Sequence, residues 1–368
     1  MFEAFQSFSY GRVAVSKNSV CTISIVISCY NYEEYVSNAI DSALAQTRPA
    51  DEIIVLDDGS TDGSRLVISR YGSQIRSIFK ENEGFITTVN RGYAEAEGTV
   101  VLFLDADDAL YPEALEEIAK VYRPDASKIQ YDLDIIDAEG KLLGRRFCNF
   151  SLMETTEATQ QRFVKTGTYP WPVTSGNAHL RSFLDKVMPM TPPIGHDGVL
   201  NTIAPLYGPV VTIPRALGQY RLHNRNMNRQ GGEAGLPSFT KSISNRLAEF
   251  KILREHAAAL GKTVPPGNLL DNELTFVSYR LMARKLGAFY PESEKDSSAW
   301  LAIRGIGLTL GSSISGKEKI LQCVWLLALL LAGRRFASLL TQLRFNRAEV
   351  KKRIQSRFKI WREKRRGL

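Results

Sequence analysis

Apolar positions follow two alternating periods along the first third of the chain. Residues 21–31 (CTISIVISCYN) form a β-branched run that predicts a strand, and residues 33–47 (EEYVSNAIDSALAQT) place apolar side chains at helical spacing. The same alternation of strand and helix continues as far as the apolar run at 100–104 (VVLFL). Because strands that alternate with single helices build βαβ units, the pattern predicts an α/β fold on a mostly parallel sheet.

The pattern changes twice in the rest of the chain. Between residues 123 and 229 it loosens, with strands expected at 128–140 and 208–222, and beyond residue 237 it becomes helical. We expect four parts: an N-terminal extension (1–20), an α/β domain (21–230), a helical domain (231–343) and a basic tail (344–368).

Three carboxylates follow the apolar run directly, at Asp105, Asp107 and Asp108. Ligands of open α/β sheets bind at the carboxyl ends of the strands, where these residues would lie. Carboxylates so close together repel one another unless a cation compensates, and their hard oxygens suit Mg²⁺ or Mn²⁺. The pattern also fits a solvated turn in which Asp108 caps the helix that starts near Pro112.

Composition excludes several classes of protein. Apolar residues make up 44% of the chain and charged residues 23%, which is ordinary for a folded protein and argues against general disorder. The 4 cysteines lie far apart without a CxxC pair, so they indicate packing rather than zinc or redox chemistry. The first twenty residues lack a secretory signal, so we expect a cytoplasmic location.

The net charge of +8 is concentrated in the tail, where 344–368 holds eleven Lys and Arg against two Glu. An apolar stripe of Val350, Ile354, Phe358 and Trp361 runs along one face of this segment. A basic helix with such a stripe favours an anionic membrane surface, with a solvated tail or a nucleic-acid arm as alternatives. Nucleic acid is disfavoured because the rest of the chain is near neutral. The apolar run at 323–333 is shorter than the ~20 residues that span a bilayer, so we expect a buried helix there, with a membrane-surface contact as the alternative because Arg334, Arg335 and the basic tail follow it.

Several motifs occur in a fixed order between Cys21 and Asn224. They are VISCYNYEEYVSNAIDSALAQT, EIIVLDDGSTDGS, NEGFITTVNRGYAEAEGTVVLFLDADD, PVTSGNAHLRS and HDGVLNTIAPLYGPVVTIPRALGQYRLHNRN. With these motifs the chain resembles the family 2 glycosyltransferases. The resemblance implies a GT-A fold, which is a nucleotide-binding α/β domain, here followed by a helical C-terminal region.

The resemblance also assigns residues to a nucleotide-sugar donor. Ser28, Tyr30 and Asp58 would hold the base and ribose, with the Tyr30 ring able to stack on the base; a packed tyrosine at position 30 is the alternative. For Asp57 a turn-forming role in DDGS is favoured. Gly176 matches a position where the backbone runs close to the donor sugar.

The metal site is implied in the same way. Asp105 would face the ribose or the metal, and Asp107 would bind Mg²⁺ or Mn²⁺ that bridges the diphosphate. His223 matches a residue that completes the metal or phosphate site in some relatives, although a lone histidine often caps or packs instead. Arg221 and Arg225 would pair with phosphate oxygens, unless they are surface charge.

On the acceptor side, the family places an acidic pair near the start of a helix. Here the matching stretch is GHDGVLN, so Asp197 would be the general base, and His196 departs from the pattern as a second base or an acceptor contact. With one base and no second nucleophile, we expect a single displacement that inverts the anomeric carbon.

These inferences predict a metal-dependent inverting glycosyltransferase of the hexosyltransferase type. It would move a sugar from a nucleotide sugar, most simply a UDP-sugar, to a saccharide or lipid-linked saccharide in cell-surface polysaccharide synthesis. It would lie peripherally on the inner face of the cell membrane. The alternative is a catalytically silent relative that binds nucleotide sugars or scaffolds an assembly complex, which the His196 departure suggests. The sequence does not indicate the sugar, the linkage or the oligomeric state.

Overall fold

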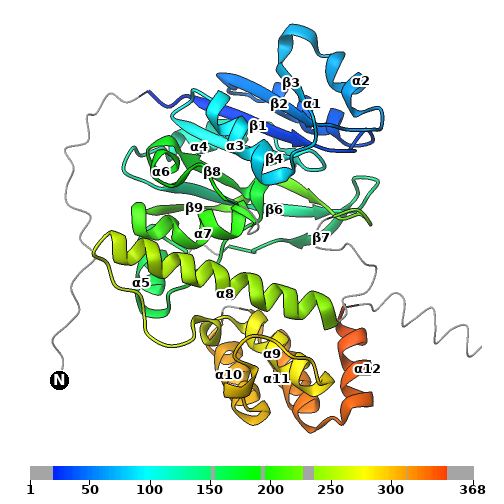
Figure 1. Ribbon diagram of the computed structural model, residues 1–368, viewed down its shortest axis with the longest axis vertical. Coiled ribbons are helices and arrows are strands. Elements are labelled where there is room, and N and C mark those ends of the chain that lie inside the picture. The colour runs from blue at the N-terminus through cyan, green and yellow to red at the C-terminus, as the bar shows by residue number, and fades with distance from the viewer. Residues whose placement is uncertain (1–19, 151–153, 192–194, 227–235, 313, 346–368) are drawn as a thin grey trace, which may run out of the picture. The chain divides into compact units, whose positions relative to one another are not determined.

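A computed structural model describes residues 20–150, 154–191, 195–226, 236–312 and 314–345 (Figure 1). These residues form two compact units, one within residues 1–223 and 251–265 and the other within 224–250 and 266–368. The first unit contains the sheet and the second is helical. The domain limits drawn from the sequence stay a prediction, and the basic tail beyond residue 345 lies outside the described residues.

The sheet begins with four strands that run parallel to one another. These are β1 (Ile23–Cys29), β2 (Glu52–Asp58), β3 (Arg76–Lys80) and β4 (Val100–Asp105), in the spatial order β3-β2-β1-β4. The helices α1 (Val36–Leu44), α2 (Ser64–Ser69) and α3 (Phe85–Glu95) connect them. This half of the sheet is the parallel arrangement that the sequence predicts.

The other half of the sheet is mixed. Its strands are β5 (Ala109–Leu110), β6 (Lys128–Ile136), β7 (Leu142–Arg146), β8 (Asn177–Leu180) and β9 (Val210–Arg221). β8 runs antiparallel to both β4 and β6, whereas β9 is parallel to β6, and the path ends with β5 against β9. The helices of this half are α4 (Ala114–Lys120), α5 (Thr156–Thr166), α6 (Arg181–Val187) and α7 (His196–Tyr207).

The central strands are apolar because both faces of the sheet are covered. Ile25 and Ile27 of β1 belong to one buried cluster with Val36 and Ile40 of α1. On α3, a Cβ added at Gly92 would lie 2.3 Å from a methyl group of Val26, so the glycine lets this helix approach the strands closely. Strands buried in this way need no polar face, which explains their unbroken apolar runs.

The second unit contains α8 (Leu236–Ala259, shared with the first unit), α9 (Leu274–Leu286), α10 (Ser298–Leu310), α11 (Gly316–Leu331) and α12 (Arg334–Phe345). Its core includes Val277, Leu281 and Leu326. The buried Arg246 guanidinium donates to both carboxylate oxygens of Glu273, at 2.9 and 2.6 Å, which satisfies the charge inside the unit. The predicted α/β fold with a helical C-terminal region is confirmed.

One expectation about this unit is wrong. The apolar run at 323–333 does not form a buried helix: α11 buries Gln322, Leu326 and Leu329, but its other face exposes Leu321 and Val324. Within the part of the chain that the structure describes, no helix combines the length and the apolar character needed to cross a membrane.

Candidate active site

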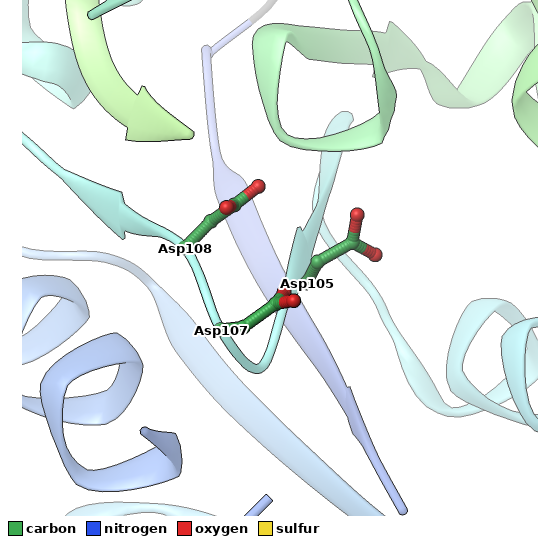
Figure 2. A group of neighbouring side chains, drawn as sticks. All are labelled: Asp105, Asp107 and Asp108. Atoms are coloured by element: carbon green, nitrogen blue, oxygen red, sulfur yellow. The ribbon is translucent and has the colours of Figure 1, made fainter. Parts of the chain in front are cut away.

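The acidic turn between β4 and β5 forms the centre of the candidate site. Asp105 ends β4, and Asp107 and Asp108 follow it in the turn (Figure 2). One carboxylate oxygen from each residue lies within 4.8 Å of those of the other two. In the sheet register Asp105 pairs with Ser28 of β1, and Asp57 of β2 pairs with Cys29. The ends of these parallel strands therefore share one edge of the sheet, as predicted.

The carboxylates of this turn carry more negative charge than the surrounding protein compensates. Burial, together with the charges of Asp107 and Asp197, raises the pKa of Asp105 well above its usual range. Burial and the two neighbouring aspartates likewise raise the pKa of Asp108. A dication would relieve this repulsion, and a set of carboxylate oxygens is what Mg²⁺ and Mn²⁺ prefer. The residues present therefore fit such an ion.

His223 lies beside the turn, two residues after the end of β9. Its Nε2 is 2.8 Å from Oδ2 of Asp107, and both side chains are buried. Its ring stacks on Tyr35, with centroids 4.9 Å apart, and meets Tyr32 edge-on. The structure thus brings the predicted His223 into the acidic cluster, held there by two tyrosines.

Asp108 fastens the turn to two other segments. Its carboxylate accepts hydrogen bonds from the Ser175 hydroxyl at 2.6 Å and from the Arg221 main-chain N–H at 2.9 Å. The alternative of a helix cap is wrong, because α4 starts at Ala114 and its N-cap residue Glu113 makes no side-chain cap bond. The sequence indicated Asp108 but not its bonds or the role of Ser175, since neither bond joins residues that are close in the chain.

The Arg221 side chain makes hydrogen bonds within the protein. It is 3% exposed, and its guanidinium donates to the main-chain carbonyls of Asp107 at 2.9 Å and of Ala138 at 3.1 Å. These bonds hold the acidic turn against the end of β9. Phosphate binding by Arg221 stays a prediction, and Arg225 lies exposed in the following turn.

On the donor side, Tyr30 follows β1 and is 45% exposed, so its ring is accessible. The Asp58 carboxylate already accepts bonds from Lys80 Nζ and from the main-chain N–H groups of Glu83 and Gly84, both at 3.0 Å. Asp57 differs, because its Oδ1 is buried without a hydrogen-bond partner. The turn-forming role that the sequence favoured for Asp57 is confirmed, because its Oδ2 accepts a hydrogen bond from the main-chain N–H of Ser60 at 3.2 Å within DDGS, and a second from Nε of Arg65 at 2.6 Å.

Gly176 lies in the short helical turn Thr174–Gly176 before β8. A Cβ added there would come within 2.6 Å of the Pro172 ring and 3.0 Å of the Tyr131 carbonyl oxygen. Packing within the protein alone therefore requires a glycine. A backbone approach to a donor sugar at this point stays a prediction.

The two acceptor-side residues begin α7 and have different surroundings. Asp197 is half-buried, and its negative charge is one of the causes that raise the pKa of Asp105, after burial and Asp107. His196 is buried, with its ring edge-on to Phe85 and Phe103, and its Nδ1 has no hydrogen-bond partner. Burial lowers the pKa of His196, although Asp197 opposes the shift, so the ring is neutral at neutral pH.

A buried lysine that the sequence did not indicate connects the start of β8 to α7. Lys128 at the start of β6 is fully buried, and its Nζ donates to Oδ1 of Asn177, at 2.7 Å, and of Asn201. The ammonium also lies 5.3 Å from the centre of the Tyr169 ring. Burial lowers the pKa of Lys128 well below its usual range. The two bonds tie the start of β8 to α7, which carries Asp197.

A parallel sheet edge that gathers carboxylates, with a further carboxylate at a nearby helix start, is typical of enzymes that bind phosphorylated nucleotides. The family described as Glycosyl transferase family 2 matches residues 24–184. An uncharacterized glycosyltransferase of Nostoc sp. is 37% identical over 229 residues, which cover 60% of this chain and 70% of that protein. The chain therefore belongs to glycosyl transferase family 2 and is a glycosyltransferase.

Other similarities cover less of the relatives or are more distant. The hyaluronan synthase of Pasteurella multocida is 30% identical over 64% of this chain but only 26% of its own length. A crystal structure of S. aureus TarS 1-349 in complex with UDP has a TM-score of 0.47 at 16% identity, and covers 87% of this chain and 88% of that chain. This chain spans 30% of a further relative, an uncharacterized glycosyltransferase of Rickettsia prowazekii.

Proposed function

We propose that this glycosyltransferase moves a hexosyl group from a UDP-sugar to a hydroxyl of a saccharide or lipid-linked saccharide, with inversion at the anomeric carbon. The observation that carries the proposal is the acidic turn, in which oxygens of Asp105, Asp107 and Asp108 lie within 4.8 Å of one another, together with the half-buried Asp197 at the start of α7. One set of carboxylates suits the donor diphosphate and its metal, and a separate carboxylate suits the acceptor.

Asp105 and Asp107, with His223 beside Asp107, would hold Mg²⁺ or Mn²⁺. When bound, the ion would neutralise the charge that develops on the departing nucleotide diphosphate. Asp108 and Arg221 fix the position of the turn through their hydrogen bonds. We therefore assign Arg221 to positioning in addition to the predicted phosphate contact.

The chain's own residues would bind the nucleotide at the ends of β1 and β2. Tyr30 offers an exposed ring for stacking on a planar base. Asp58, whose carboxylate accepts from the loop before α3, would also accept a hydrogen bond from the base N–H. A pyrimidine with an N–H at its edge, as in uridine, matches that acceptor.

Asp197 would take the proton from the acceptor hydroxyl as that oxygen bonds to the sugar carbon. His196 has its ring packed between Phe85 and Phe103, and we assign it to shaping the start of α7. A saccharide acceptor on a polysaccharide pathway is supported by the likeness to a protein named hyaluronan synthase. We also propose a peripheral position on the inner face of the cell membrane, supported by the basic, amphipathic sequence of residues 344–368.

Thermal unfolding in the presence of UDP-, GDP- and other nucleotide sugars, with and without Mn²⁺, tests the donor part. A ligand that binds only the folded state raises the midpoint, and we expect the largest rise for a UDP-sugar with Mn²⁺. Asp107→Ala should remove the Mn²⁺-dependent part of the rise. Glu255→Ala, which removes a surface carboxylate of α8, should leave it unchanged.

Turnover then separates an enzyme from a silent binding protein. Release of UDP from the stabilising donor, in the presence of saccharide acceptors, is expected for the wild-type chain and not for Asp107→Ala. If donors bind but no acceptor and no water molecule receives the sugar, the scaffold alternative holds.

A further inference from the structure

Exposed apolar side chains are concentrated in the helical unit. Of the twenty-one large apolar side chains exposed in the described part of the chain, thirteen lie between residues 289 and 343. Single exposed apolar residues are normal on protein surfaces, but a concentration of this kind marks an interaction site.

The outward face of α11 is apolar from Ile320 to Leu331. Ile320, Leu321, Val324, Leu327 and Leu331 recur at helical spacing on one side, and the last of them is 85% exposed. The polar Gln322 lies on the opposite, buried side. A surface helix ordinarily points its polar side outward, whereas α11 exposes apolar side chains in addition to burying Leu326 and Leu329.

The outward face of α10 has the same character. Trp300, Ile303 and Leu310 are exposed along it. The single charged residue of this helix, Arg304, donates instead to the Asp271 carbonyl and to Asn272 Oδ1, both at 2.7 Å. The two helices pack on one another, since a Cβ at Gly305 of α10 would lie 3.0 Å from Leu326 of α11. We refer to the exposed apolar side chains of these two helices as the α10–α11 face; they are Trp300, Ile303, Leu310, Ile320, Leu321, Val324, Leu327 and Leu331.

The charges around this face are almost all positive. Residues 298–345 contain six Lys and Arg and one acidic residue, Glu318, whose carboxylate is used in the cap of α11. Exposed cations stand at both ends of the α11 stripe, with Lys317 before it and Arg334 and Arg335 after it. The chain then continues into the basic segment 344–368, with a net charge of +9 from eleven Lys and Arg and two Glu.

We propose that the α10–α11 face is a membrane-docking surface that inserts its apolar side chains into the interface of an anionic bilayer. Aliphatic and tryptophan side chains rimmed by Lys and Arg match the acyl boundary and the phosphate headgroups together. A second copy of the chain fits less well, because a symmetric pair would bring the basic rims of both copies against one another. The folded helices, rather than the tail alone, then hold the protein at the membrane.

Docking through this face is independent of the sugar chemistry. It is measured without substrate, by flotation of the full-length protein with vesicles of equal parts phosphatidylglycerol and phosphatidylcholine. We expect the double variant Leu321→Glu with Val324→Glu to partition at least about tenfold more weakly, because it places two anions where apolar groups meet acyl chains and anionic headgroups.

A matched control is available in the sheet unit. Leu66 of α2 is 62% exposed, against 60% for Leu321, so Leu66→Glu makes the same chemical change at an equally exposed site. It should float like the wild type. The milder pair Leu321→Ser with Val324→Ser covers the case in which the Glu pair fails to fold, and thermal unfolding with a nucleotide sugar reports on the sheet unit of every variant. Unaltered donor stabilisation with lost flotation supports docking whatever the donor proves to be.

Three results would overturn the proposal that the α10–α11 face docks on a membrane. The first is wild-type flotation of both face variants. The second is complete loss of flotation on deleting residues 346–368 combined with no effect of the face variants, which would leave the tail as the sole anchor. The third is a wild-type dimer in solution that the face variants convert to a monomer without changing flotation, which would make the face a contact between copies.

Discussion

Replacing Asp108 with alanine removes the acceptor of two hydrogen bonds that hold the acidic turn. The carboxylate is fully buried and accepts from the Ser175 hydroxyl at 2.6 Å and from the Arg221 main-chain N–H at 2.9 Å. The hydroxyl can rotate toward another acceptor, but the main-chain N–H is fixed by β9 and cannot reach water. We therefore expect Asp108→Ala to destabilise the sheet unit.

The magnitude follows from the groups left behind. A buried donor without its acceptor costs about 1–3 kcal/mol, and bonds to a charged acceptor are among the stronger ones. Removal of one of three crowded carboxylates gives back part of this cost, so we expect a net loss of about 1–2 kcal/mol. For a domain of roughly 200 residues this lowers the unfolding midpoint by about 2–8 °C. Asp108→Asn keeps an acceptor oxygen and the side-chain shape, so its loss should stay below about 1 kcal/mol.

Thermal unfolding followed by circular dichroism gives the two midpoints. Hydrogen exchange of peptides that cover residues 105–111 shows whether the loss begins at the turn. An Asp108→Ala protein with the wild-type midpoint and wild-type exchange would refute the reasoning. Addition of Mn²⁺ should still raise the unfolding midpoint of Asp108→Asn. If it does not, Asp108 binds the metal in addition to holding the turn through its hydrogen bonds.

Three further changes are predicted. Asp197→Asn should keep the stabilisation by donor and Mn²⁺ but lower turnover about 10²-fold or more, and near-normal transfer would move the base elsewhere. Gly176→Ala should cost about 1–3 kcal/mol by overpacking against Pro172, whereas Gly307→Ala, with open space around it, should cost nothing. Burial, Lys128 and His196 lower the pKa of His179. At mildly acidic pH the His179 ring is therefore protonated in the unfolded chain but neutral in the folded protein. Stability should therefore fall as pH drops below about 6.5, by up to ~1.4 kcal/mol per pH unit for this residue, with a shallower slope in urea titrations of His179→Leu.

The sequence by itself determined the parallel half of the sheet and the position of the acidic turn. Apolar runs that alternate with helical spacing define βαβ units, and parallel strands of such units have their carboxyl ends at one edge. Asp105 and Ser28 were therefore predictable neighbours, and the register confirms them as partners. The family resemblance was also recognisable from the sequence, because the order of the motifs along the chain does not depend on tertiary contacts.

Tertiary structure decided what each polar group contacts. Asp108 and Arg221 are 113 residues apart, and Asp108 and Ser175 are 67 apart, so no local pattern could distinguish a fastening carboxylate from a helix cap. The same holds for α11, whose apolar sequence predicted a buried helix. Periodicity shows which side chains are apolar but not which neighbour covers them, and burial depends on the helices that pack against each face. In α11 one face meets the core of the helical unit through Leu326 and Leu329, and the other, with Leu321 and Val324, is left exposed.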